Sequence, residues 1–554
     1  MSAGAALAVI VFMGLVGHQL FKRHETFDIA YHVSLLCGPI FLGTALLSPS
    51  LPLLRATYIS AGTYLASLII STLVYRASPL HPLAIYPGPF GCRLTKFWMA
   101  YVSFTGQQHN YIKSLHDRYG DVVRIGPNEV SIKDPSVVHA MLGPTGLPHG
   151  PMYYGKILVR KPGDMPMLGI TDTAEHLKRR RPWARAFSGA AIKEYEPMVA
   201  SRALQLVQAL QSQQGEVDIG KWINYFSYDF MCDMAFGGGS ELLRDGDLNN
   251  FWEMLENGLP PGTFVGNVPW LGPYLARIPA LTADLQKVLA HCQSLTVGRI
   301  QRGAQRRDLF HYLNNEDEPE TQPPPLKLIV NEGVVAIVVG SDTVSITLTS
   351  IFFCLATHPE AYKRLEEEID RFYPPGQDPY NTEHHREMHY LTAVINEALR
   401  VYPTVPGGVQ RCVPHNSNGV TLGSIFLPPG TSAWYHQLFA YHDARHFFPK
   451  TDDFWPERWL LASGRLSFSS FSSNIDEAKF VHNEAAFVPF SYGPMNCVGK
   501  NLAMLEMRVV VCAVLQKFRL HLRDGWDPRT YGEGLKDFFV TTRPPVPVTL
   551  VPRF

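Results

Sequence analysis

The chain has 554 residues, with 49 basic and 49 acidic side chains, and it contains no basic block. This balance argues against nucleic-acid binding. Its eight cysteines are scattered without a Cys-x-x-Cys pair. Such a pattern is typical of a reducing compartment and excludes a disulfide scaffold and a zinc knuckle.

The first eighty residues are markedly apolar. Charge-free stretches occupy residues 1–21, 29–54 and 56–75, and each is long enough to cross a bilayer, which takes roughly 20 apolar residues. A cleaved signal peptide is the alternative for the first stretch, and Pro39 and Pro49 in the second leave the number of spans at two or three. The sequence therefore predicts a membrane anchor over residues 1–78.

Basic residues set the expected orientation of this anchor. Lys22 and Arg23 follow the first stretch and Arg76 follows the third, whereas only Arg55 lies between the second and the third. By the positive-inside rule, three spans place the N-terminus in the lumen and everything after Arg76 in the cytosol.

A second domain is expected from residue 79 to residue 554. It begins at a proline-rich connector over residues 79–89, where proline interrupts any helix that leaves the membrane. Residues 122–132 alternate like a β-hairpin with Gly126, Pro127 and Asn128 at the bend. Most segments between 170 and 400 have helical periodicity, and 419–434 returns to short strands. The sequence predicts a mainly α domain with a small β region.

Residues 490–499 read Phe-Ser-Tyr-Gly-Pro-Met-Asn-Cys-Val-Gly and lead into an apolar helix. Backbone N–H groups at a helix start lower the pKa of a thiol, so this loop is suited to offer Cys497 as a thiolate ligand to a haem iron. Gly493 and Gly499 would let the backbone approach a porphyrin, and Phe490 would shield the sulfur from water. The plain alternative for Cys497 is an ordinary buried thiol.

The loop resembles the cysteine-ligand signature of the cytochrome P450 family, Phe-x-x-Gly-x-x-x-Cys-x-Gly, except that Met495 stands where a basic residue is usual. Segments 339–343, 397–400 and 454–459 resemble three further family motifs, in family order. The resemblance covers residues 79–554. It implies the cytochrome P450 fold, mainly α with a small β region, here preceded by N-terminal transmembrane helices.

The resemblance also implies an activity and its cofactor. The haem b would be ligated axially by Cys497, and a monooxygenase reaction would insert one atom of dioxygen into a lipophilic small molecule. Because the chain lacks a glycine-rich dinucleotide fingerprint, electrons would come from NADPH through a separate cytochrome P450 reductase, with cytochrome b5 as a further donor. With the anchor, this implies the endoplasmic-reticulum membrane, a cytosolic catalytic domain, and a likeness to fungal members that make secondary metabolites such as terpenoids.

Two interpretations compete for residues 333–356, which are apolar apart from one charge at Asp342. They are long enough for a fourth transmembrane helix. They also resemble the central helix of the family, in which Asp342 and Thr343 would deliver the protons that splitting dioxygen requires and Gly340 would leave room for dioxygen. We favour the second interpretation, with Ile337 and Val344 lining the same pocket.

Glu397 and Arg400 lie three residues apart on a predicted helix, which by itself is a weak signal of a surface pair. The later segment 454–459, Phe-Trp-Pro-Glu-Arg-Trp, supplies Arg458. The resemblance implies that Glu397, Arg400 and Arg458 form a buried network that braces the cysteine loop.

The two haem propionates need positive charge and hydrogen-bond donors. His176 and Arg180, followed by Trp183, resemble the His-x-x-x-Arg clamp of some family members, whereas the Trp-x-x-x-Arg arrangement is broken by Phe187. Arg411 resembles the arginine on the strand beside the haem edge. These residues are expected to replace the basic residue that is missing at position 495.

Other interpretations stay open. Lys178 and Arg179 fit a solvated face or a docking patch for an acidic redox partner as well as a haem contact. A haem-thiolate isomerase or dehydratase would have little use for Asp342 and Thr343, which speak against it. A non-enzymatic haem carrier or sensor would keep the cysteine loop and need no reductase.

Overall fold

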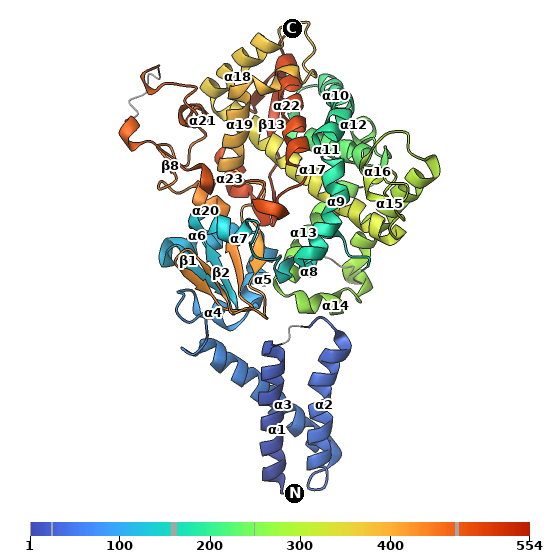
Figure 1. The fold of residues 1–554 in the computed structure, drawn as a ribbon, viewed down its shortest axis with the longest axis vertical. Helices are drawn as coiled ribbons and strands as arrows, with labels where there is room; N and C mark the ends of the chain where they lie inside the picture. Colours follow the sequence, from blue (N-terminus) through green and yellow to red (C-terminus); the bar gives the residue numbers. More distant parts are fainter. Residues whose placement is uncertain (1, 24–25, 157–162, 249, 471–475) are drawn as a thin grey trace.

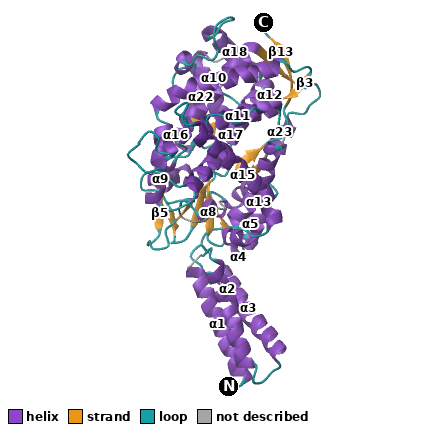
Figure 2. Cartoon of the chain, turned by 90° about the vertical axis from the view of Figure 1, so that its right-hand side faces the viewer, coloured by secondary structure: helices purple, strands orange, loops and turns teal. Residues whose placement is uncertain are grey.

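The computed structural model describes residues 2–23, 26–156, 163–248, 250–470 and 476–554. Its N-terminal helices lie apart from the larger remainder (Figure 1) and project from it as a stalk in the second view (Figure 2). These helices are α1 (Ala3–Arg23), α2 (Ile29–Leu47) and α3 (Leu53–Ala77). All three are long and apolar enough to cross a membrane, so the described structure provides three candidate spans here and not two.

Small residues let the three stalk helices pack closely, as in membrane helix bundles. On α1, Gly14 lies against Ser67 of α3, and Gly17 lies against Tyr64 of α3. A Cβ atom on either glycine would collide with the side chain opposite it. The Tyr64 hydroxyl also donates to the Leu35 carbonyl oxygen on α2 over 2.6 Å. The stalk is therefore held by specific contacts as well as by its apolar composition.

The remainder is mainly helical, as the sequence predicts. Its helices, in chain order, are α4 (Phe90–Leu94), α5 (Phe97–Phe104), α6 (Gln108–Tyr119), α7 (Val138–Leu142), α8 (Pro151–Lys156), α9 (Thr173–Ala186), α10 (Gly189–Gln211), α11 (Ile219–Phe236), α12 (Leu242–Asp245), α13 (Phe251–Asn267), α14 (Gly272–Leu275), α15 (Pro279–Arg302), α16 (Leu309–Leu313), α17 (Leu326–Thr357), α18 (Pro359–Phe372), α19 (His389–Val401), α20 (Gln437–Tyr441), α21 (Glu457–Ala462), α22 (Lys500–Lys517) and α23 (Arg529–Gly534).

The strands form small sheets. The largest has the order β1-β2-β7-β4, in which β2 and β7 are parallel and the other neighbours are antiparallel. The predicted hairpin at 122–132 is its β1–β2 pair, and the predicted strands at 419–434 are β5, β6 and β7. The strands are β1 (Val122–Gly126), β2 (Glu129–Ile132), β3 (Glu216–Asp218), β4 (Gln410–Cys412), β5 (Val420–Leu422), β6 (Ile425–Leu427), β7 (Ser432–Tyr435), β8 (Phe447–Phe448), β9 (Val481–His482), β10 (Phe518–Leu522), β11 (Lys536–Phe538), β12 (Val540–Thr542) and β13 (Pro547–Pro552).

Helix α17 runs through the middle of the larger part and packs against α11, α15, α19 and α22. About 67% of its most apolar window is buried inside the protein, compared with 28%, 17% and 11% for α1, α2 and α3. The apolar surface of α17 is thus covered by protein, as expected for a helix that is hydrophobic on all sides and lies in a protein core. The structure therefore supports the interpretation of α17 as the central helix of the domain and not as a fourth transmembrane span.

Candidate active site

A cavity of about 1080 Å³ lies between α17, the cysteine loop and the segment that follows α19. It is larger than a typical small-ligand site of roughly 300–1,000 Å³. The cysteine loop contributes Phe490, Cys497 and Gly499 to its wall, and α17 contributes Asp342 and Thr343. Residues far apart in the sequence therefore meet at one space, as the motifs predict.

The cysteine loop is closed by its own backbone. The Cys497 N–H donates to the Phe490 carbonyl oxygen over 2.8 Å, and α22 begins at Lys500. The Cys497 side chain is accessible, but the surface that it exposes is cavity wall deep inside the protein. Burial raises the pKa of the Cys497 thiol, and hydrogen bonds from the N–H groups of Gly499 and Lys500 act in the opposite direction.

The two glycines of the loop serve different purposes. Gly493 has φ +74°, and a Cβ atom there would lie 2.1 Å from the Leu142 carbonyl oxygen. Gly493 is not among the described residues that line the cavity, and the tight turn against Leu142 by itself requires a glycine there, so its approach to a porphyrin stays a prediction. Gly499 does line the cavity, and a Cβ atom there would lie 3.9 Å from Cys497 Sγ.

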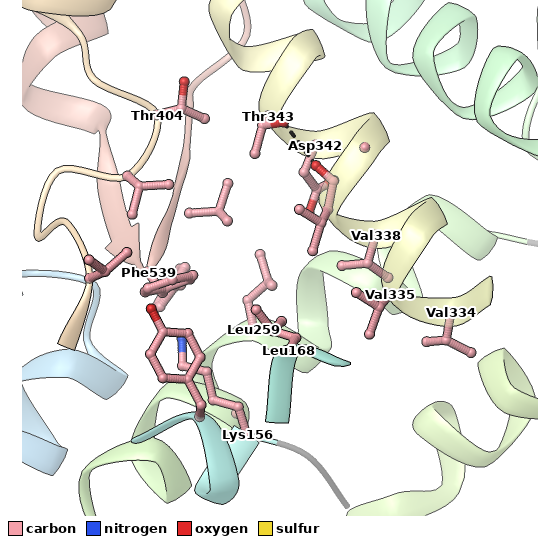
Figure 3. A pocket seen from close by; sticks show the side chains of 18 of the residues that line it. Lys156, Leu168, Leu259, Val334, Val335, Val338, Asp342, Thr343, Thr404 and Phe539 are labelled. Atoms are coloured by element: carbon pink, nitrogen blue, oxygen red, sulfur yellow. Dashed lines mark hydrogen bonds between the residues drawn. The ribbon is translucent and has the colours of Figure 1, made fainter. Parts of the chain in front are cut away.

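Asp342 and Thr343 both line the cavity from α17 (Figure 3). The Asp342 side chain is only 6% exposed, and burial raises its pKa to about 7. The Thr343 hydroxyl donates to the Val339 carbonyl oxygen over 2.8 Å. The site therefore holds a carboxyl group that keeps its proton near neutral pH, next to a hydroxyl group.

One expectation for α17 is corrected and another is met. Gly340 lines the cavity, as predicted, next to Met231 of α11, whose Sδ would lie 2.6 Å from a Cβ atom on this glycine. Ile337 is 1% exposed and does not line the cavity, because its side chain packs in the core. Val344 does line the cavity.

Glu397 of α19 lies at the centre of a buried network. Its carboxylate accepts hydrogen bonds from Arg400 Nη2 over 2.8 Å and from Arg458 Nε over 3.0 Å. All three side chains are buried. The network reaches the cysteine loop indirectly: Arg400 donates to the Tyr441 carbonyl oxygen, and the Tyr441 hydroxyl accepts the N–H of Val488 over 2.8 Å.

The basic residues around the cavity separate into two groups. His176, Arg180 and Trp183 line the cavity, and Arg180 donates to the carbonyl and side-chain oxygens of Asn496, each over 2.7 Å. Arg411 lies behind the wall, with Nη1 2.7 Å from Met495 Sδ. Arg180 from α9 and Arg411 from β4 therefore both reach the cysteine loop.

Lys178 and Arg179 belong to neither group. Both pair with Glu175 on the same helix, and neither lines the cavity. Lys178 has 71% of its side chain exposed. The described structure therefore gives Lys178 a solvated face, whereas Arg179 has only 19% of its side chain exposed and lies outside the cavity wall.

Several cavity residues were missed by the sequence analysis. His149 stacks on Tyr153 with ring centroids 4.5 Å apart, and Lys156 and Phe539 lie further along the same wall. The sequence gives Asn496 no role beyond its place in the loop, although it accepts hydrogen bonds from Arg180 in the structure. These residues lie on short or irregular segments that carry no spacing signal, so only the fold could reveal them.

The residues around the cavity fit a haem. His176 Nε2 and the Arg411 atoms Nε and Nη2 are buried and find no hydrogen-bond partner among the described residues, as expected of donors meant for a bound anion. Gly499 leaves free the space next to the Cys497 sulfur. Charge, space and a sulfur ligand thus occur together at one wall.

Comparisons with known proteins agree with this geometry. The family model for cytochrome P450 matches residues 87–550. The chain is 31% identical to the cytochrome P450 monooxygenase FCK2 of Fusarium pseudograminearum, covering 99% of this chain and 98% of the relative. It is 30% identical to the cytochrome P450 monooxygenase nodW of Hypoxylon pulicicidum (94% and 93% covered) and 27% identical to tryprostatin B 6-hydroxylase of Aspergillus fumigatus (99% and 96% covered).

The fold and the site define a haem-dependent monooxygenase, an oxidoreductase that works with a redox partner on a lipophilic substrate. The chain belongs to the cytochrome P450 family. The family, the mainly α fold and the monooxygenase activity predicted from the sequence are confirmed. Its apolar N-terminal helices indicate membrane anchoring.

Proposed function

We propose that this protein is a membrane-anchored monooxygenase of the endoplasmic reticulum that hydroxylates a lipophilic natural product, with Cys497 as the axial ligand of a haem b. The observation that carries the proposal is the position of the Cys497 sulfur in the wall of a large cavity, with the N–H groups of Gly499 and Lys500 directed at it. When bound, the haem supplies the iron at which dioxygen is activated. Phe490 excludes water from the sulfur side.

The propionates are held by the donors that converge on the cysteine loop: His176, Arg180, Trp183 and Arg411. Arg411 takes the place of the basic residue that Met495 replaces, because its guanidinium already contacts the Met495 sulfur. The unpartnered nitrogens of His176 and Arg411 support this assignment. An ionised donor gives a stronger hydrogen bond to an anion than a neutral donor does.

Asp342 and Thr343 deliver protons on the substrate side of the cavity. A general acid works best when its pKa lies near the operating pH, and burial brings the pKa of Asp342 to about 7. Thr343 positions a proton-carrying water with its hydroxyl, which must first leave the Val339 carbonyl oxygen. These two residues favour a monooxygenase over a haem carrier.

Glu397, Arg400 and Arg458 act structurally. Their hydrogen bonds tie α19 to residues 441–459, and the ring of Trp459 packs on Phe487, just before the cysteine loop, with centroids 4.6 Å apart. We infer that the network holds the loop in the geometry that binds haem.

Electrons come from NADPH through a separate cytochrome P450 reductase, with cytochrome b5 as a further donor. Residues 1–78 form the anchor and 79–554 the catalytic domain, which faces the cytosol because Lys22, Arg23 and Arg76 flank the first and third helices. The cavity wall is mainly apolar, which supports a lipophilic substrate. Relatives named as a tryprostatin B hydroxylase and other fungal monooxygenases support a secondary metabolite, such as a terpenoid.

The absorption spectrum of the reduced, carbon-monoxide-treated membrane protein tests the proposal, because it reports the axial sulfur directly. We expect the spectrum of a haem-thiolate protein from the unaltered chain and its loss in Cys497→Ser. Cys512→Ser, which changes a buried cysteine on α22 away from the cavity, is the matched control and should keep the spectrum. A Cys497→Ser protein with an unchanged spectrum and turnover would overturn the proposal.

A further inference from the structure

One half-buried lysine in the cavity wall has no role in haem binding or proton delivery. Lys156, the last residue of α8, reaches into the cavity, while Asp342 and Thr343 project from α17 on the other side (Figure 3). Its aliphatic chain lies against α13, where a Cβ atom on Gly266 would be 3.2 Å from Lys156 Cε. Among the described residues, Lys156 makes no hydrogen bond and no ion pair within 4 Å.

The aromatic residue beside this lysine is held in a strained backbone. Lys156 Nζ lies 4.1 Å from the centroid of the Phe539 ring. Phe539 is the turn residue between β11 and β12 and has φ +79°, a region that bulky residues rarely adopt. Its N–H donates to Asp537 Oδ1 over 2.9 Å, which holds the turn. Strain of this kind collects at ligand sites, where it aims a side chain.

Lys156 is separate from the propionate donors. Arg411 acts electrostatically on His149 and His176, whereas the charge that acts on Lys156 is that of Asp537. Asp537 lies more than 4 Å from the ammonium group and also interacts with His109. Among the described residues, the ammonium group therefore has one cation–π contact and otherwise faces a mainly apolar space.

We propose that Lys156 anchors a carboxylate of the substrate, so that the enzyme oxygenates a lipophilic carboxylic acid at a carbon remote from the acid group. The apolar body of the substrate would lie along Leu168 and Leu259, which are drawn between Lys156 and α17 in Figure 3, and along Val338 of α17. The inference rests on the proposed function, because it assigns the substrate class of the same cavity.

The chemistry of the lysine supports an anionic ligand. Burial lowers the pKa of Lys156 to about 7, so without an anion beside it only part of the lysine is protonated at neutral pH. A carboxylate within hydrogen-bond distance favours the charged form, so ligand binding and protonation of Lys156 strengthen each other. An ester or alcohol gains much less from the same contact.

Two probes of nearly equal size test this proposal: dodecanoate and its neutral methyl ester. Each is titrated into the haem-loaded protein in phosphatidylcholine nanodiscs, and binding is followed by the shift of the haem Soret band. Partition of a probe into the lipid is the same for every variant, so it cancels when the ratio of the two dissociation constants is compared between variants.

We expect the unaltered protein to prefer dodecanoate, and Lys156→Met to reduce this preference by about tenfold or more. Lys156→Arg keeps the charge and should keep the preference. Lys113→Met, which removes an exposed lysine paired with Asp117 on α6, outside the cavity wall, is the matched control and should leave the ratio unchanged.

Three results would overturn the anchor: no preference in the unaltered protein, a preference that survives in Lys156→Met, or an equal loss of affinity for both probes. The last result would mean that Lys156 only balances the charge of Asp537. Should Lys156→Met fail to fold, the ratio of the two dissociation constants is compared between the unaltered protein and Lys156→Arg. A missing preference for dodecanoate in either protein would still overturn the anchor. Absence of the haem-thiolate spectrum from the unaltered protein would instead contradict the proposed function, so the two failures are distinguishable.

Discussion

Two buried groups of polar side chains differ in how completely they are satisfied. Around Glu397, both carboxylate oxygens accept hydrogen bonds from arginine and tryptophan side chains, and Arg400 also donates to three backbone carbonyl oxygens. In the cavity, the described residues give no hydrogen-bond partner to the carboxyl group of Asp342 or to the ammonium group of Lys156.

This difference separates structure from function. A buried charge with matched partners is costly to disturb and holds the chain in one arrangement. A buried polar group without a partner costs free energy in the folded state, which is explained when a ligand or a reaction uses that group. The two groups should therefore respond in opposite ways when a carboxylate is removed.

Removal of the Glu397 carboxylate should have the largest effect. Glu397→Ala leaves Arg400 and Arg458 buried without their shared anion, and we expect a loss of about 3–5 kcal/mol in the free energy of unfolding, with loss of haem. Denaturant unfolding and the Soret absorbance per protein measure both. Glu175→Ala, which breaks the part-exposed pair with Arg179, is the control and should cost about 0.2–1 kcal/mol. Similar losses in the two variants would contradict the comparison.

Removal of the Asp342 charge should stabilise the protein. Because burial raises the pKa of Asp342 to about 7, the folded chain between pH 4 and pH 7 holds a proton that the unfolded chain has released. The stability that this proton contributes is lost as the pH rises through that window. We expect Asp342→Asn to exceed the unaltered protein by up to about 4 kcal/mol at pH 8 and to match it near pH 4.

The free energy of unfolding of Asp342→Asn and the unaltered protein, measured in denaturant from pH 4 to pH 8, checks this prediction. A difference that does not change with pH would show that Asp342 does not keep its proton in the folded state. Asp453→Asn, outside the cavity, is the control and should show no such gain.

The two loop glycines allow a finer test. Gly493→Ala forces a Cβ atom against the Leu142 carbonyl oxygen at φ +74°, and we expect it to lower the free energy of unfolding by about 1–3 kcal/mol. Gly499→Ala has its nearest atoms at 3.7 and 3.9 Å and should leave this free energy nearly unchanged. It should instead lower the haem content, because its methyl group lies beside the sulfur. The reverse order of effects in unfolding would contradict the assignment of the two glycines.

Loss of the Thr343 hydroxyl should have the smallest effect in free energy. We expect Thr343→Ala to keep consuming NADPH while releasing peroxide, with product lowered by about tenfold or more. Thr349→Ala is the matched control on the same helix, because the Thr349 hydroxyl is buried outside the cavity wall and donates to the Ser345 carbonyl oxygen over 2.8 Å. The amounts of product and of peroxide formed per NADPH, measured together, show whether the loss of the Thr343 hydroxyl uncouples NADPH consumption from product formation. An unchanged product yield would contradict the assignment of Thr343 to proton delivery.

Local patterns in the sequence determined the parts of the fold that depend on neighbours along the chain. The hairpin at 122–132, the end of α3 before the proline-rich connector and the cysteine loop ahead of α22 each follow from a few adjacent residues, because turn chemistry and helix starts are local. The order of the motifs along the chain also predicted that Asp342, Glu397 and Cys497 belong to one domain. These elements could be predicted without any tertiary contact.

Only the tertiary structure decided which distant side chains meet. Arg180 finds Asn496 across 316 residues of sequence, Arg411 takes up the Met495 sulfur, and Lys156 lies on the Phe539 ring. Gly340 borders the cavity next to Met231 of α11, a neighbour that its motif could not indicate. The physical reason is that such contacts depend on the path of the whole chain, whereas periodicity and spacing report only the face of one helix or strand.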